Sequence, residues 1–435
     1  MVNADRRVLA AVVASTFFVG FGGGVVFPIL PNLGTVIGIS PFLVGVILST
    51  NRFVRLVANA PAGALVDRIG TRTPFVAGLA IEGVATTGYV LALWMDAAGP
   101  VAVAGVDVTA AEWWFILARI LWGLGSALVF ATAYTIATDV SSGGSRGMDM
   151  GIVRGGILLG FPAGLVMGGV VSDLASVEAA FGLAAAFALF ASVLAYVSVP
   201  ETHVESERSS VKPWEVDTAI PTLTVGLVNF AVLFAYIGAL FATLVLFLEA
   251  IEVGVFGLNA QGSSGVFMAV TVLAAAVSML GGGKASDLRD SRVPILLGFL
   301  GVSVIGFLLL AAVDAGTFDG VVDPAVTLIV ACVLIGAGQG GVSGPMTALL
   351  ADLTPAERTG RAMGTNNVFG DVGGGLGPLL SLPLVDVVGF GPIYAACALL
   401  PAIAALVLVA GVYVETGSVR PGTASVATGG AAADE

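Results

Sequence analysis

The sequence GALVDRIGTRTP at residues 63–74 returns, in altered form, as GKASDLRDSRVP at residues 283–294. Both copies keep a glycine, an aspartate, an arginine and a proline at the same spacing, and both separate long apolar runs. Further along, pairs such as Asp139 and Asp352 keep the correspondence at a slightly shorter offset. Self-similarity of this kind indicates that the chain is built from two related halves.

The composition places the apolar runs in a lipid bilayer. The 435 residues are 57% hydrophobic and 11% charged, with a mean hydropathy of +1.03. Soluble domains carry roughly 25% charged residues, so the composition excludes a water-soluble globular protein, and its apolar content excludes a disordered chain. With only two cysteines, Cys332 and Cys397, a secreted disulfide scaffold is excluded as well.

Twelve apolar stretches are long enough for a helix to cross a hydrocarbon core of about 30 Å. Helices are favoured over barrel strands because the stretches are continuously apolar rather than alternating. The stretches lie near residues 8–30, 41–62, 74–95, 113–138, 150–172, 177–199, 219–248, 263–283, 293–313, 325–350, 362–385 and 391–413.

We therefore expect an all-α membrane protein with twelve transmembrane helices in two pseudo-repeated six-helix bundles. Residues 1–199 would form the first bundle, residues 200–218 a cytoplasmic linker and residues 219–413 the second bundle. Residues 414–435, which are rich in alanine, glycine, serine and threonine, are predicted to be a disordered cytoplasmic tail.

The basic residues of the loops all fall on one side of the predicted membrane. The loops on the amino-terminal side hold 13 of the 17 lysines and arginines, and the opposite loops hold none. Because basic loops stay in the cytoplasm, this asymmetry predicts a multi-pass protein of the cell membrane with both termini cytoplasmic. The thirteen residues are Arg6, Arg7, Arg68, Arg72, Arg146, Arg208, Lys212, Lys284, Arg289, Arg292, Arg358, Arg361 and Arg420.

The loop at residues 63–72 resembles the signature loop of the major facilitator superfamily of transporters. The matching residues are Gly63, Leu65, Asp67, Arg68, Gly70 and Arg72, whereas Thr71 stands where a basic residue is common. The resemblance implies a cytoplasmic gate loop that holds the two halves together in the outward-open state. A tight turn with cytoplasmic anchors is the simpler alternative. The second copy keeps Asp287 and Arg292 but loses other positions.

Two further motifs resemble sequences of the same superfamily. RILWGLG at residues 119–125 is similar to a motif that proton-coupled members use in coupling, with snorkelling of Arg119 to the surface as the alternative. GILLGFPAGLVMGG at residues 156–169 and GGGLGPLL at residues 373–380 resemble the glycine-rich motif of the twelve-helix drug/proton antiporter branch. Phe161 interrupts the Gly-Pro pair of the first copy, and close packing of kinked helices would also produce both copies.

Six charged residues fall inside the predicted spans, where a charge is costly and normally pairs or lines a cavity. They are Arg52, Arg55, Glu82, Arg119, Arg154 and Asp371, and four positive minus two negative charges leave an excess of +2. We expect Asp371, close to the midplane, to load and release a coupling proton or else to pair with an arginine. Glu82 could do the same, but by family analogy its helix lies toward the outside of the bundle. We therefore expect Glu82 to pair with Arg52 or Arg55.

The predicted function is secondary active transport by alternating access, most simply the proton-coupled efflux of a small amphipathic compound. Uptake or exchange of an organic anion is the alternative that the positive excess motivates, and a non-transporting receptor is the alternative from another class. The sequence shows no enzyme motif, metal-ligand cluster, cofactor motif or nucleic-acid-binding patch, and its one histidine, His203, lies in the linker. The expected partners are substrate, protons and lipid, and the expected state is a monomer.

Overall fold

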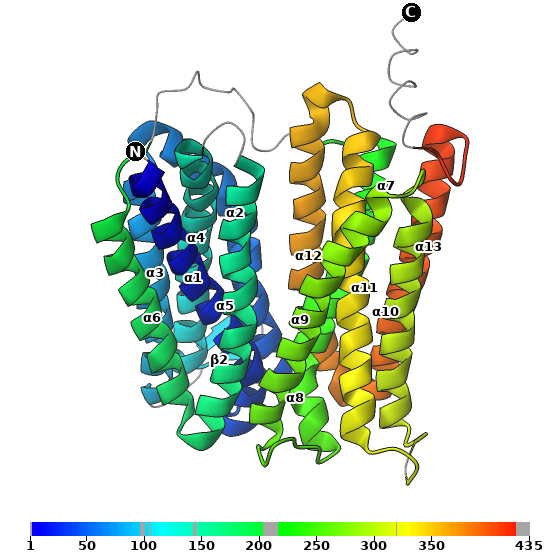
Figure 1. Ribbon diagram of the computed structural model, residues 1–435. Coiled ribbons are helices and arrows are strands. Elements are labelled where there is room, and N and C mark those ends of the chain that lie inside the picture. The colour runs from blue at the N-terminus through cyan, green and yellow to red at the C-terminus, as the bar shows by residue number, and fades with distance from the viewer. Residues whose placement is uncertain are drawn as a thin grey trace, which may run out of the picture. The chain divides into compact units, whose positions relative to one another are not determined.

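The computed structural model describes residues 2–95, 101–103, 106–141, 146–202, 216–318 and 320–422. Within these ranges twelve helices are long and apolar enough to cross a membrane, which confirms the predicted number of spans (Figure 1). The spans are α1 (Val2–Ile37), α2 (Pro41–Ile69), α3 (Arg72–Trp94), α4 (Ala110–Val140), α5 (Arg146–Leu174), α6 (Val177–Ser198), a seventh span made of α7 (Ile220–Leu233), η1 (Phe234–Leu240) and α8 (Phe241–Ala250), then α9 (Ala260–Asp287), α10 (Val293–Asp314), α11 (Pro324–Asp352), α12 (Ala356–Val388) and α13 (Phe390–Thr416).

Two compact units make up the chain. The first unit holds Met1–Ser210 and Gly254–Ala269, and the second unit holds Val211–Val253 and Val270–Glu435. Helix α9 is thus divided between the units, whereas the sequence placed a single boundary at the 200–218 linker.

The beginning of α9 is joined to the first unit by two polar contacts. The backbone N–H of Asn259 donates to Asp173 Oδ2 at 3.2 Å, and the Asn32 amide donates to Gln261 Oε1 at 3.3 Å. Residues 203–215 of the predicted linker and 423–435 of the predicted tail lie outside the described residues, and α13 runs two residues past the expected start of that tail.

Helix ends fall where the sequence supplies caps. Ser40 precedes the first residue of α2, and its hydroxyl accepts a hydrogen bond from Leu43 N–H at 3.3 Å. Thr109 and Glu112 form a capping box at the start of α4. Gly70 ends α2 at φ +87°, a conformation that favours glycine, so α3 can begin only two residues later.

The all-α prediction needs one addition, a small hairpin in the first unit. Strands β1 (Val101–Val103) and β2 (Val106–Val108) pair antiparallel, with Val101 opposite Val108. The hairpin lies between α3 and α4, at the end of the first unit opposite the N-terminus (Figure 1). The offset between the two repeats changes in this same loop, so the hairpin occupies residues added to the first half.

Helices α1 and α5 meet along a line of glycines. On α5, Gly156, Gly160 and Gly164 recur at every fourth residue and lie against the backbone of α1. A methyl group at Gly160 would overlap the carbonyl oxygen of Phe17, and one at Gly164 would overlap that of Phe21. Small residues at this spacing let two membrane helices touch along their backbones. The glycine-rich motif of the fifth span therefore has a packing role.

The corresponding line in the second unit runs between α12 and the seventh span. A Cβ at Gly373 would overlap the carbonyl of Phe230, and one at Gly377 would overlap Gly238. Gly238 lies in η1, a π-helical stretch of seven residues that the sequence analysis did not predict. A π-helical stretch accommodates an extra residue in the helical turn, so the seventh span changes its winding where it touches α12.

Candidate functional site

Arg119 of α4 is buried in the first unit, with 2% of the residue exposed. Its Nε donates to the carbonyl of Ile47 at 3.0 Å. Its Nη2 donates to the carbonyl of Leu48 at 3.0 Å and to Asn51 Oδ1 at 2.5 Å, and its Nη1 reaches Tyr89 Oη at 3.5 Å. The guanidinium therefore does not snorkel to the surface. It joins α4 to the backbone of α2, whose carbonyl dipoles stabilise the charge.

Glu82 of α3 is enclosed between α3 and α4, with 1% of the residue exposed. Gly125 of α4 makes room for it, because a Cβ there would lie 2.9 Å from Glu82 Cγ. Glu82 Oε1 has no hydrogen-bond partner among the described residues. Arg55 of α2 is the cation whose charge acts on this carboxylate, and its guanidinium also stands 5.7 Å from the centre of the Phe130 ring. The pairing of Glu82 with Arg52 or Arg55 stays a prediction.

Asp371 lies in the middle of α12 and is half-buried. Its neighbours Gly370 and Gly373 pack on Asn229 and Phe230 of α7. At 3.6 residues per turn, Asp371 projects well away from this α7-facing line.

The remaining arginines of the predicted set lie in the first unit. Arg52 of α2 is half-buried, and Arg154 of α5 is exposed. Asp371 belongs to the second unit, so the first unit by itself holds four arginines and one of the two carboxylates.

The first loop, residues 63–72, is held by a residue outside it. Glu201 follows α6, and its Oε1 accepts hydrogen bonds from Thr71 N–H at 2.7 Å and from the Thr71 hydroxyl at 2.9 Å. Its Oε2 accepts from Arg72 N–H at 3.3 Å. These N–H groups belong to the start of α3, where a carboxylate is stabilised by the free donors and the helix dipole. A side chain at Gly70 would displace the Glu201 carboxylate, and the φ of +87° favours glycine there.

Arg72 turns toward α6 rather than toward an acid. Its Nη2 donates to the Tyr196 carbonyl at 2.7 Å, and its guanidinium lies 5.1 Å from the centre of the Tyr196 ring. Asp139, at the end of α4, instead accepts from the Thr202 hydroxyl at 3.0 Å. Asp67 and Arg68 are exposed.

The second loop, residues 283–292, is held by its own arginine. Arg292 Nε donates to Asp352 Oδ2 at 2.6 Å, and Nη1 donates to Asp287 Oδ1 at 2.8 Å and to Ser286 Oγ at 2.9 Å. Burial lowers the pKa of Arg292, but the hydrogen bonds to Asp352 and Asp287 outweigh it, so the pKa lies above its usual value. Arg292 and its three partners link the ends of α9 and α11 to the start of α10.

Sequence reasoning missed Glu201, which it assigned only to the linker. The available signal was Pro200, because a proline ends a helix and allows the next residue to leave the helical path. Asp352 was noted as the repeat equivalent of Asp139, yet the sequence did not indicate which of the two binds the arginine of its loop.

Comparison with known proteins agrees with this fold. The family model described as Major Facilitator Superfamily matches residues 12–378 and 315–433. A bacterial homolog of the human lysosomal transporter Spinster, solved in an inward-facing and occupied conformation, superposes with a TM-score of 0.72. The match covers 95% of this chain and 97% of that one, at 15% sequence identity.

Two relatives in sequence match nearly the whole chain, and a third matches about half of it. An MFS-type transporter of Methanocaldococcus jannaschii is 22% identical over 387 residues, covering 87% of this chain and 92% of its own length. The multi-drug resistance efflux pump PmrA of Streptococcus pneumoniae is 23% identical over 412 residues, covering 90% and 92%. Multidrug resistance protein 1 of Bacillus subtilis is 25% identical over 208 residues, about half of each chain. This protein belongs to the Major Facilitator Superfamily and is a membrane transporter, not an enzyme.

Proposed function

We propose that this transporter exports small amphipathic compounds in exchange for protons, by alternating access across the cell membrane. The similarity to two proteins named for multidrug resistance supports export of such compounds. The confinement of basic loop residues to one side supports an orientation with both termini in the cytoplasm.

Asp371 is the proton-accepting group in this proposal. A coupling carboxylate must lie within the span and still be reached from water as the protein alternates. Asp371 is a half-buried acid within the span of α12, and it lies on a different side of that helix from the glycines that pack on α7, which supports this role. This placement is the observation that carries the proposal. Glu82, which is enclosed between α3 and α4, is assigned the structural role.

Transport of an organic anion, the alternative, depends on positive charge that a substrate can reach. Arg119 donates to two backbone carbonyls and to Asn51, so its charge is already engaged. Arg55 acts on Glu82 and lies over Phe130. Two of the four arginines of the spans therefore already have contacts within the first unit, which favours the exporter.

Reconstituted vesicles with an imposed pH gradient provide the test. The probes are fluorescent amphipathic dyes, measured for accumulation with and without the gradient. We expect Asp371→Asn to abolish gradient-driven accumulation while dye exchange in the absence of a gradient persists. Glu112→Gln is the matched control for loss of a carboxylate within a span, because Glu112 is buried in the α4 capping box.

Two results would contradict the proposal. Retained gradient-driven accumulation in Asp371→Asn would remove the assigned proton site. Movement of organic anions but of no cationic or neutral dye, with loss of that movement in Arg55→Ala, would establish the anion alternative instead.

A further inference from the structure

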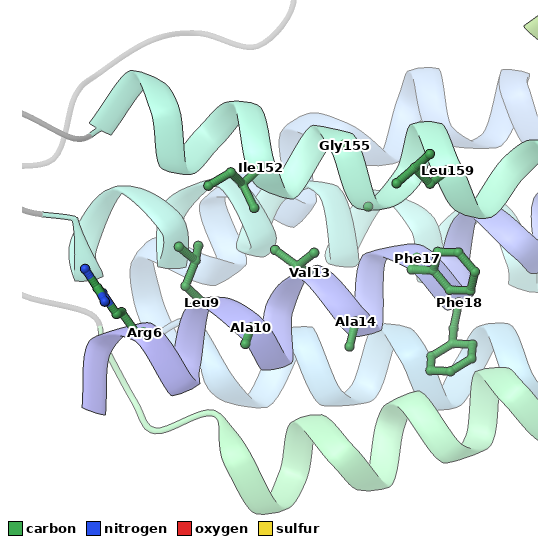
Figure 2. Close-up of a pocket in the computed structure, with 11 residues that line it drawn as sticks. Arg6, Leu9, Ala10, Val13, Ala14, Phe17, Phe18, Ile152, Gly155 and Leu159 are labelled. Carbon is green, nitrogen blue, oxygen red and sulfur yellow. The ribbon is translucent and has the colours of Figure 1, made fainter. Parts of the chain in front are cut away.

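A groove runs along the outside of the first unit between α1 and α5. It encloses about 740 Å³, and the described residues that line it all belong to these two helices. Its lining is apolar except at one end, where Arg6 lies, as Figure 2 shows. In Figure 1, α1 is seen between α5 and α6, the two helices it packs against. The groove therefore follows α1 along a side of the unit that is not covered by a helix of that unit.

The shape of the groove comes from small residues. Ala10 and Ala14 of α1 and Gly155 of α5 leave the space, while Leu9 and Leu159 stand beside it (Figure 2). A Cβ at Gly155 would meet no atom within 4 Å, so the space beside it is open. The neighbouring Gly156 differs, because a Cβ there would lie 2.6 Å from the Val13 carbonyl. Gly156 thus serves the contact of α1 with α5, and Gly155 leaves the groove open.

The length of the groove fits one leaflet of a bilayer. Twelve residues separate Arg6 from Phe18, which is about 18 Å at 1.5 Å per residue. Half of a hydrocarbon core of about 30 Å is about 15 Å. A chain that enters beside Arg6 would therefore reach Phe18 near the middle of the membrane. There Phe18 packs on Phe187 and Phe190 of α6 and closes that end.

We propose that this groove binds one acyl chain of an anionic phospholipid, with the lipid phosphate at Arg6. Charge complementarity selects this occupant, because the one charged side chain among the described residues that line the groove is the Arg6 guanidinium at its mouth, and guanidinium groups bind phosphate oxygens bidentately. The mouth lies at the end of the bundle where α2 ends with Arg68 and α3 begins with Arg72. Under the orientation proposed above, that end faces the leaflet that holds anionic lipids.

A transported compound and a protein helix fit the groove less well. A helix is about 10 Å across with its side chains, and a partner helix would need an apolar face in place of a charge at Arg6. A soluble amphipathic substrate would not require a length matched to a leaflet. A lipid satisfies the charge, the length and the apolar lining together.

Native mass spectrometry of the purified full chain tests the proposal. The probes are phosphatidylglycerol and phosphatidylcholine with identical acyl chains, offered to the protein in detergent. We expect one phosphatidylglycerol to remain bound and phosphatidylcholine to be retained less. Arg6→Gln should weaken retention of phosphatidylglycerol about fivefold, the effect of one basic group near an anionic lipid surface. Arg7→Gln, which changes an exposed arginine outside the groove, should not.

A second pair of variants tests the groove itself. Gly155→Leu should fill it and remove the bound lipid, and the open space at Gly155 allows the protein to fold normally. Gly151→Leu, one turn earlier on α5 with equally open space, is the matched control and should keep the lipid.

Three results would overturn the proposal. One is equal retention of the two lipids by the unchanged protein, and another is unchanged retention in both Arg6→Gln and Gly155→Leu. The third is loss of dye transport in Gly155→Leu with lipid retention intact, which would make the groove a path for the substrate. The lipid-retention measurements do not depend on Asp371, so the lipid site and the proton site can fail separately.

Discussion

The first and second loops carry the same motif, but different side chains of the motif are hydrogen-bonded in the two loops. In the first loop, the Thr71 hydroxyl is hydrogen-bonded to Glu201, while Arg72 Nε is buried without a partner among the described residues. In the second loop, Arg292 Nε is bonded to Asp352, while the equivalent hydroxyl, Ser291 Oγ, is buried without a partner in the described part of the chain. A repeated motif therefore fixes which residues are present but not which of them are paired.

The difference is decided by the segment that follows the sixth helix of each half. The first half reads Val-Pro-Glu-Thr at residues 199–202, and the second half reads Tyr-Val-Glu-Thr at residues 413–416. Proline ends α6 at Ser198, so Glu201 leaves the helix and reaches the start of α3. Without a proline, α13 continues through Thr416, and Glu415 stays exposed on that helix. One proline thus determines whether an acid is supplied to the loop.

The largest expected effect comes from removing the arginine of each loop. Arg292→Met breaks the contacts to Asp352 and Asp287 and leaves Asp352, with 29% of its side chain exposed, without its cation. We expect the free energy of unfolding to fall by about 2 kcal/mol. Arg72→Met removes one hydrogen bond to a carbonyl and one ring contact and should cost about 1 kcal/mol.

Thermal unfolding of both variants in detergent measures this difference. A larger loss of stability for Arg72→Met than for Arg292→Met would show that the polar side chains of the two loops are not paired as described.

The raised pKa of Arg292 predicts how the stability that it contributes depends on pH. Stability from this cation is present below its unfolded pKa and is lost only as the pH rises through the folded pKa. The difference between the variants should therefore persist throughout the neutral range.

A smaller effect is expected from Glu201. Glu201→Gln keeps the size of the side chain but removes the charge that faces the start of α3, at a cost of about 1 kcal/mol. Glu415→Gln is the matched control, since Glu415 occupies the corresponding position and is exposed on α13. Pro200→Val tests the cause: it should extend α6 and give the same loss as Glu201→Gln. Hydrogen exchange of the Thr71 and Arg72 N–H groups reports directly whether Glu201 still binds them. Unchanged protection of these groups in Pro200→Val would contradict the role of the proline.

The sequence predicted the spans well and the partners of the polar residues poorly. Twelve apolar runs are visible because a membrane helix must be apolar over a set length, and each run coincides with a helical span. The π-helical stretch and the hairpin were not predicted. Nothing in the apolar run 219–248 distinguishes one helical winding from another, and the hairpin lies in a loop of the first half alone.

Depth along a helix does not settle the environment of a charge. The sequence left open whether Arg119 snorkels to the surface, and only the position of α2 beside α4 resolved the choice. Glu82 is similar, because its enclosure depends on Gly125 of another helix. Charges within spans are found from sequence, whereas their partners are contributed by helices distant in the chain.

The smallest expected effect concerns the two hydroxyls. Thr71→Val removes the hydrogen bonds of this hydroxyl to Glu201 and to the Thr202 hydroxyl, so we expect a loss of about 1 kcal/mol. Ser291→Ala removes a buried hydroxyl that makes no hydrogen bond with the described residues, so it should be neutral or slightly stabilising. Unfolding in detergent compares the two, and a loss in Ser291→Ala equal to that in Thr71→Val would mean that the second hydroxyl has a partner after all. Opposite outcomes at equivalent positions would show that each loop is stabilised by the partner that its own half supplies.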